Sequence, residues 1–305
     1  MERGDRYVQT LASTRMDNLL ENDSQSTTVS EQQVLVHKHF TEAAFYWKQV
    51  YADRDVYAVI HQQRRSALFS MIDELCLAPG SDVLDVGCGA GLISVGLASR
   101  GFITKAVDPT QAMIELTERA ALEAGVSDSV SATVGDIHRL DFPDNTFKLV
   151  LAIGVLPWLQ DYHRALNELA RVLEPGGYLI ANVDNRWALH RILDPSANAI
   201  TAPLIRGVGR TLRALHLRRP RSGVTTTTAS RRTFNNLLRH YGLETVETAM
   251  FGFGPFRIVG QRYLAFSTGV QCHRFLQELC DRNIPILRSM GAQYLVTAKK
   301  PLQGI

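Results

Sequence analysis

The stretch from Val83 to Gly91, Val-Leu-Asp-Val-Gly-Cys-Gly-Ala-Gly, constrains the fold of this chain more than any other. An aliphatic run that contains an acid is followed by glycines at every second position, and an apolar helical pattern begins at Leu92. This order predicts a buried parallel strand, a tight turn and a helix. Glycines let backbone N–H groups approach a ligand, and the start of a helix carries partial positive charge. The stretch indicates a nucleotide-type cofactor site; the alternative is a tight turn that binds nothing.

Two further acids follow predicted strands. The strand 103–107 ends in Asp108, and the strand 130–134 ends in Gly135 and Asp136. An acid at the tip of the second strand can accept hydrogen bonds from both hydroxyls of a ribose. An acid at the tip of the third strand could hold the exocyclic amine of adenine. A lone aspartate is often a helix cap or turn residue, but acids at three successive strands favour a site.

These motifs resemble those of the class I S-adenosylmethionine-dependent methyltransferases. The first motif of that family, E/DxGxGxG, matches the glycine stretch, Asp108 matches its ribose-binding acid, and 135–137 match its adenine-binding motif. Residues 147–156 resemble its fourth-strand motif, and residues 169–180 resemble the stretch before its fifth strand. The chain departs from the family at Lys148, where an aspartate is usual, and at Pro157-Trp158, where a histidine pair is common. The resemblance covers the residues between the first and fifth predicted strands.

The resemblance implies an α/β, Rossmann-like sheet of seven strands in the order 3-2-1-4-5-7-6, with the last strand antiparallel. Helices would cover both faces, with a helical cap before the sheet and a helical lid inserted after strand five. S-adenosyl-L-methionine would be the cofactor. The residues expected to bind it are Asp85, Gly87, Cys88, Gly89, Gly91, Asp108, Pro109, Asp136, Ile137, Ile153 and Gly154.

Composition along the chain suggests how it is divided. Residues 1–30 are polar, which predicts a disordered tail, and 31–300 are expected to form a single domain. A helical cap is expected at 31–76, from helices over 33–51 and 55–76. The sheet core would use 80–184 and 230–300, and 185–229 would be a basic lid insertion.

Aromatic and amide side chains near the expected cleft are candidates for contact with the acceptor. They are Tyr46, Trp47, Trp158, Asn185 and Phe253. The alternative for the aromatic residues is core packing. The loop Phe251–Phe256 would place its phenyl rings near the cleft or a membrane, or simply pack them inside.

Polar side chains near the expected cleft do not define a catalytic base. His138, His163 and His190 are candidates, but none stands in a context that singles it out. Arg64 and Arg65 could meet a carboxylate, although a solvated helix face explains them equally well.

The insertion is strongly basic. From Pro195 to Leu243 there is no acidic residue, and apolar residues recur at helical spacing between arginines in 204–221. Such a helix can lie on an anionic membrane or contact phosphates; the alternative is a solvated lid. Nucleic acid is the least favoured partner, because no recognised binding module accompanies a pI of 8.7.

The predicted function is methyl transfer by in-line displacement to a small-molecule or lipid-linked intermediate. The alternatives are a non-catalytic partner subunit that binds the cofactor and, less favoured, an NAD-dependent dehydrogenase, whose third glycine would come later. Four cysteines without metal-ligand spacing predict no metal site and a reduced, cytoplasmic location, peripheral to a membrane if the insertion binds lipid.

Overall fold

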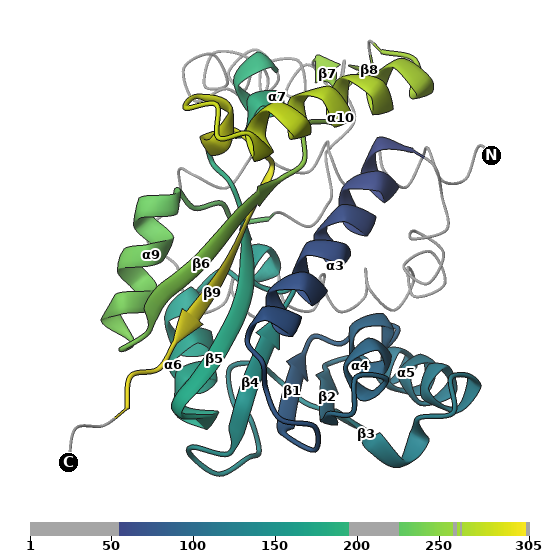
Figure 1. The fold of residues 1–305 in the computed structure, drawn as a ribbon, viewed down its shortest axis with the longest axis vertical. Helices are drawn as coiled ribbons and strands as arrows, with labels where there is room; N and C mark the ends of the chain where they lie inside the picture. Colours follow the sequence, from purple (N-terminus) through teal and green to yellow (C-terminus); the bar gives the residue numbers. More distant parts are fainter. Residues whose placement is uncertain (1–54, 195–225, 259–260, 263, 303–305) are drawn as a thin grey trace, which may run out of the picture.

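The sheet at the centre of the molecule has seven strands in the order β3-β2-β1-β4-β5-β9-β6 (Figure 1). The computed structural model describes residues 55–194, 226–258, 261–262 and 264–302. Strand β9 runs antiparallel to both β5 and β6, and the other pairs are parallel. The strands are β1 (Asp82–Val86), β2 (Ile103–Asp108), β3 (Val130–Val134), β4 (Phe147–Ala152), β5 (Leu173–Asp184), β6 (Glu244–Phe251) and β9 (Gln293–Lys299).

The central strands are buried on both faces, as their continuous apolar sequences require. In β1, Val83 packs into a cluster with Leu68 of α3, whereas Leu84 and Val86 join a cluster on the opposite face. Successive side chains alternate between faces of a strand, so an aliphatic residue at each position is needed to fill both layers. The run that opened the sequence is therefore a strand buried between two helical layers.

Helices form those two layers. One face is covered by α3 (Val56–Glu74), α4 (Leu92–Ala98) and α5 (Gln111–Glu123), and the other by α6 (Tyr162–Val172) and α9 (Arg231–His240). Figure 1 shows α7 (Leu189–Leu193) and α10 (Phe266–Asp281) beyond the end of the sheet toward which β1, β2 and β4 point. The short elements are η1 (Ser127–Ser129), η2 (Leu156–Trp158), η3 (Leu287–Ser289), β7 (Arg257–Ile258) and β8 (Gln261–Arg262).

Three helices begin at side chains that accept a backbone hydrogen bond. Asp55 accepts from Ala58 N at 2.7 Å, Asp161 from His163 N at 2.7 Å, and Ser230 from Thr233 N at 3.1 Å. A cap of this kind stabilises a helix by about 1 kcal/mol. Helix α9 therefore begins directly after its serine cap.

The predicted fold class is confirmed, including the antiparallel last strand. The helix predicted over 55–76 is α3. The tail, the helix predicted over 33–51 and the basic stretch 204–221 lie outside the described residues, and the division into parts stays a prediction. No helix in the described ranges is both long and apolar enough to cross a bilayer.

The phenylalanine loop corrects one interpretation. Phe251, Phe253 and Phe256 are all buried, and Phe253 and Phe256 belong to the same core cluster as Leu238 of α9. Rings so enclosed cannot face a membrane. The alternative that the sequence left open, hydrophobic packing, is what the structure has.

Candidate functional site

In the glycine turn after β1, other residues pack against Gly87 and Gly91, whereas none of the described residues packs against Gly89. All three glycines have positive φ, at +72°, +55° and +80°. A Cβ on Gly87 would lie 2.2 Å from Cγ2 of Val155, and one on Gly91 would lie 2.8 Å from Cα of Thr117. A Cβ on Gly89 would meet no atom of the described residues within 4 Å. Gly89 therefore borders space that a ligand can fill.

Asp108 joins this turn to the end of β2. Its carboxylate accepts hydrogen bonds from the N–H of Gly89 at 3.1 Å and from the N–H of Thr110 at 2.9 Å, one on each oxygen. The side chain is buried. Each carboxylate oxygen has two lone pairs, so a carboxylate fixed in this way can accept further hydrogen bonds from ligand hydroxyls.

Asp85 lies beneath the turn and is fully buried. The hydroxyl of Ser94 in α4 donates to it at 2.6 Å. Burial raises the pKa of Asp85 from 3.8 to about 6, against the lowering effect of Ser94, and the charge of Asp108 raises it further. Burial and these two acids also raise the pKa of the Cys88 thiol, so Cys88 is protonated at neutral pH.

The next two predicted residues stand at the end of β3. Asp136 is exposed, and its Oδ1 accepts from the backbone N–H of His138 at 2.9 Å and lies 2.8 Å from Nδ1 of that histidine. Ile137 beside it is buried. The imidazole is thus bonded to the predicted adenine-binding acid, which favours a supporting role for His138.

The end of β4 contributes Gly154, which has a φ of +79°. Its N–H donates to Oδ1 of Asn182 in β5 at 2.6 Å. A Cβ at Gly154 would lie 3.5 Å from Nη1 of Arg64. Ile153 is buried, whereas Pro109 at the end of β2 is exposed.

Arg64 and His61 are buried polar residues of α3, so the solvated helix face that the sequence left open for Arg64 is wrong. Nη1 of Arg64 donates to Oε1 of Gln293 in β9 at 3.3 Å. Burial, followed by the charge of Arg64, lowers the pKa of His61, so its imidazole is neutral at neutral pH. Arg64 stands four residues from Ile60 and from Leu68, which are also buried. A charged residue within an apolar stripe is the sequence signal that could have identified the burial of Arg64.

The candidates for acceptor contact differ in what the structure shows of them. Tyr46 and Trp47 lie outside the described residues, and Trp158 is half-buried in η2. The Asn185 amide donates to the carbonyls of Ser289 and Gly291, both at 2.8 Å, and its oxygen accepts from Trp187 N. These contacts favour a structural role for Asn185, and the burial of Phe253 does the same for that residue.

The other two histidine candidates show no catalytic arrangement. His163 is bonded through Nδ1 to the hydroxyl of Tyr241 at 2.8 Å, in an exposed setting. His190 lies on the short helix α7 and is half-buried. The sequence assigns no catalytic base, and the assignment stays open.

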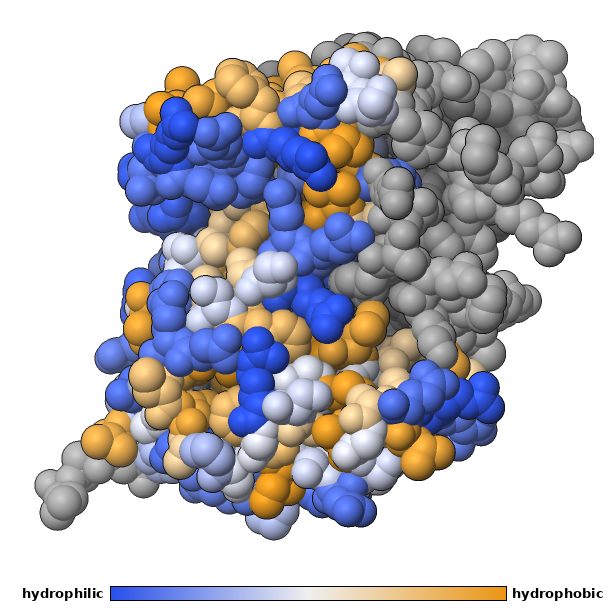
Figure 2. All heavy atoms as spheres, turned by 45° about the vertical axis from the view of Figure 1, so that its right-hand side comes forward, coloured by the Kyte–Doolittle hydropathy of each residue, from blue (hydrophilic) through white to orange (hydrophobic). Residues whose placement is uncertain are grey.

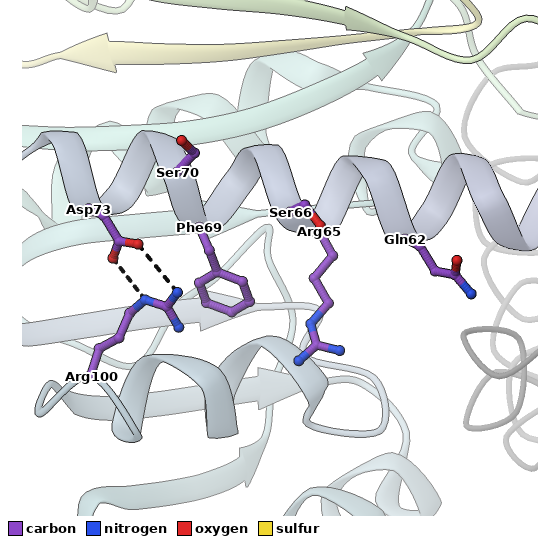
Figure 3. A pocket seen from close by; sticks show the side chains of 7 residues that line it. All are labelled: Gln62, Arg65, Ser66, Phe69, Ser70, Asp73 and Arg100. Carbon is purple, nitrogen blue, oxygen red and sulfur yellow. Dashed lines mark hydrogen bonds and ion pairs between the residues drawn. The ribbon is translucent and has the colours of Figure 1, made fainter. Parts of the chain in front are cut away.

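A groove of about 580 Å³ lies between α3 and the end of α4 (Figure 3). There the guanidinium of Arg100 pairs with Asp73 at 2.8 Å and lies 4.1 Å from the centre of the Phe69 ring. None of the predicted cofactor-binding residues lines the groove, whereas the carboxylate candidate Arg65 does, so the groove is distinct from the glycine turn. Its lining residues are Gln62, Arg65, Ser66, Phe69, Ser70, Asp73 and Arg100.

Comparison with known proteins agrees with this geometry. Residues 84–181 match a family described as a methyltransferase domain. An uncharacterized methyltransferase of Schizosaccharomyces pombe is 41% identical over 105 residues, which cover 32% of this chain and 37% of that protein. Ajmaline N-methyltransferase of Rauvolfia serpentina is 30% identical over 163 residues, or 49% of this chain and 55% of the enzyme. The chain thus spans about a third to a half of the length of these relatives.

A solved structure shares the fold over most of the chain. The crystal structure of magnesium protoporphyrin IX methyltransferase from Synechocystis PCC 6803 with bound SAH superposes with a TM-score of 0.59 at 16% identity. The superposition covers 88% of this chain and 99% of that one. At this level of identity the likeness concerns the fold, which is the seven-stranded sheet described above.

Proposed function

We propose that this chain is a class I S-adenosylmethionine-dependent methyltransferase and that it transfers a methyl group to a small-molecule acceptor. S-adenosyl-L-methionine is the cofactor of this family. The observation that carries the proposal is the Asp108 carboxylate, fixed by the Gly89 and Thr110 N–H groups at the rim of the open space beside Gly89.

The residues around the turn fit this cofactor. Asp108 would accept hydrogen bonds from the ribose hydroxyls, in charge-assisted bonds that contribute about 1.5–3 kcal/mol. Asp136 would accept from the adenine amine, with Ile137 as an apolar neighbour. Gly89 supplies room for the ligand because a side chain there would occupy it.

Arg64 would bind the carboxylate of the methionine part of the cofactor. Its guanidinium lies against Gly154 at the end of β4, and it is held by Gln293. A buried arginine beside a carboxylate forms stronger hydrogen bonds than neutral groups do. Since Arg64 belongs to α3, cofactor binding would also fix this helix over the sheet.

The bound cofactor supplies an electrophilic methyl group, and the protein contributes position and exclusion of water. Holding an acceptor in line with that methyl group can account for roughly 7–11 kcal/mol of the barrier. The neutral imidazole of His61 and the buried face of α3 would border this space. We assign no catalytic base.

A lipid-linked acceptor is the narrower form of the proposal. It rests on the basic, amphipathic sequence 204–221, which would bring the enzyme to an anionic membrane from the cytoplasm. A non-catalytic subunit that only binds the cofactor is the alternative. Formation of S-adenosylhomocysteine from S-adenosylmethionine by the purified protein, with candidate acceptors, would exclude it. A dehydrogenase is disfavoured by the antiparallel strand β9.

Replacement of Asp108 by alanine tests the site. We expect Asp108→Ala to weaken S-adenosylhomocysteine binding by about tenfold or more, because its hydrogen bonds to the ribose are lost. Isothermal titration calorimetry measures the affinity. Asp128→Ala, in η1 at the opposite end of β3, is the matched control and should bind normally. Equal affinity of the Asp108 variant and wild type would refute the ribose role.

A further inference from the structure

Exposed apolar side chains gather where α7 and η3 meet. Trp187 is 55% exposed, Ile286 is 69% exposed and Ile284 is 41% exposed. Leu193 of α7 and Phe275 of α10 are exposed as well. Figure 2 shows hydrophobic residues at the top of the molecule beside strongly hydrophilic ones. We call Trp187, Ile284 and Ile286 the apolar tip.

Backbone hydrogen bonds hold the two parts of the apolar tip together. The N–H of Leu189 donates to the carbonyl of Met290 at 2.8 Å, and the Asn185 side chain bonds the carbonyls of Ser289 and Gly291. The turn itself is closed by a bond from Arg288 N to the Ile284 carbonyl at 3.0 Å. The isoleucines are therefore presented by an ordered turn, and burying them elsewhere would require rearranging it.

Three exposed arginines stand near these side chains in sequence, together with the exposed acid Asp281 at the end of α10. Arg186 and Arg288 are exposed, and neither forms an ion pair with any residue that the structure describes. Arg282 is also exposed and is paired with Glu278. The chain after Asp194 continues into the arginine-rich, acid-free stretch. Apolar tips flanked by arginines are the composition that binds an anionic lipid surface, where each cation near the surface contributes about 1 kcal/mol.

The apolar tip also lies at the end of the molecule toward which the parallel strands point. In Figure 1, α7 and α10 stand beyond the end of the sheet toward which β1, β2 and β4 point. Parallel strands of such sheets bind their ligands outside their carboxyl ends. A membrane on this side would lie on the same side of the molecule as the glycine turn and Asp108.

We propose that the apolar tip, with Arg186 and Arg288, docks this protein onto an anionic membrane surface. The isoleucines and the indole would enter the region between headgroups and acyl chains, and the arginines would pair with lipid phosphates. This docking is independent of methyl transfer, but on the proposed function it brings the site to lipid-linked acceptors.

Co-sedimentation with vesicles tests the proposal, with the full chain and without cofactor or acceptor. Vesicles of phosphatidylcholine and phosphatidylglycerol should retain the protein, and vesicles of phosphatidylcholine alone should retain much less. The double variant Ile284→Ser/Ile286→Ser should bind the anionic vesicles about tenfold more weakly, because apolar insertion is lost. Arg288→Gln should reduce binding about fivefold.

Matched controls keep the result specific. Leu122→Ser on α5 removes another exposed aliphatic residue, and Arg239→Gln on α9 removes another exposed arginine. Both should bind like wild type. Exposed substitutions of this kind cost little stability, and circular dichroism confirms that each variant is folded.

Three outcomes would overturn the proposal. The wild-type protein could fail to bind anionic vesicles, or the double variant could bind as well as wild type while Arg206→Gln/Arg210→Gln/Arg213→Gln loses binding. Light scattering could also show an oligomer for wild type and a monomer for the double variant, in which case the apolar tip joins copies of the chain. Because the vesicle assay involves no methyl transfer, a failure of the protein to bind vesicles would not contradict the proposed function. An unchanged affinity of Asp108→Ala for S-adenosylhomocysteine would likewise not contradict membrane docking.

Discussion

Gly87 and Gly89 share one turn but face different surroundings. The space next to Gly87 is filled by Val155 from the end of β4, whereas none of the described residues fills the space next to Gly89. The first glycine therefore allows the turn to pack on β4, and the second allows a ligand to approach. The spacing of the two glycines in the sequence does not reveal which of them has which role.

Alanine substitutions should separate stability from binding at these positions. Gly87→Ala should lower the free energy of unfolding by roughly 2–4 kcal/mol, because the new methyl meets Val155 and the positive φ is strained. Gly89→Ala should cost only about 1 kcal/mol but weaken S-adenosylhomocysteine binding about tenfold. Urea unfolding and calorimetry measure the two quantities.

A compensating change checks the cause at Gly87. Val155→Ala removes the Cγ2 atom that the new methyl would meet at 2.2 Å, so it should restore part of the stability of Gly87→Ala. If the two glycine variants lose equal stability and equal affinity, the division of roles is wrong.

Asp85 should make the fold less stable at alkaline pH. Its pKa rises from 3.8 to about 6 on folding, mainly through burial. The folded state therefore holds the proton more tightly, and this contribution, roughly 3 kcal/mol in full, is lost as pH rises through about 6. Asp85→Asn removes the titration and keeps an oxygen for Ser94. The free energy of unfolding of the variant relative to wild type should be higher at pH ~8 than at pH ~4. Urea unfolding at the two pH values measures this difference, and a reversed or absent difference would contradict the assignment.

At the scale of elements, α10 fastens the phenylalanine loop to the sheet. Nδ1 of His273 accepts from the N–H of Phe253 at 3.1 Å, and Oε1 of Gln277, one turn later, accepts from the N–H of Gly252 at 3.1 Å. Nε2 of His273 lies 2.8 Å from Oε1 of Gln63 in α3. An amide oxygen only accepts, so His273 donates there, and the ring connects three elements.

This ring should make stability depend on pH in the opposite sense to Asp85. Burial lowers the pKa of His273 from 6.5 to about 4, so the unfolded chain takes up a proton more readily. The contribution of His273 to stability is complete above pH 6.5 and is lost as pH falls toward about 4. Lowering pH from about 7.5 to 5 should therefore cost roughly 2 kcal/mol through this residue.

The variant His273→Asn isolates that contribution. The asparagine oxygen can still accept from Phe253 N, but the side chain does not titrate. The variant should be less stable overall and should show a smaller fall in the free energy of unfolding between the same two pH values. An unchanged pH dependence in urea unfolding would assign the acid sensitivity to other groups.

At the scale of the whole molecule, the predictable part of the fold is local. Strands β1 to β5 follow from apolar runs and glycines that lie close together in sequence, and the strands predicted over 103–107 and 130–134 agree with β2 and β3 to within one residue. The sequence named Arg64 as a candidate but did not predict its burial or its partner, because Gln293 comes from the opposite end of the chain. Burial of Phe253 likewise depends on α10, which contacts it only after folding. Sequence patterns therefore predict the local glycine turn better than they predict contacts between distant parts of the chain.

The place of β9 has a consequence for synthesis on the ribosome. Among the described strands it is the last to be made, yet it lies between β5 and β6. The whole ladder of β6 is formed with β9. While residues 293–299 are still inside the exit tunnel, the nascent chain holds an incomplete sheet whose β5 margin and whole β6 segment are open to wrong pairing. Chaperones that shield such margins would be needed most until residues 293–299 have left the tunnel.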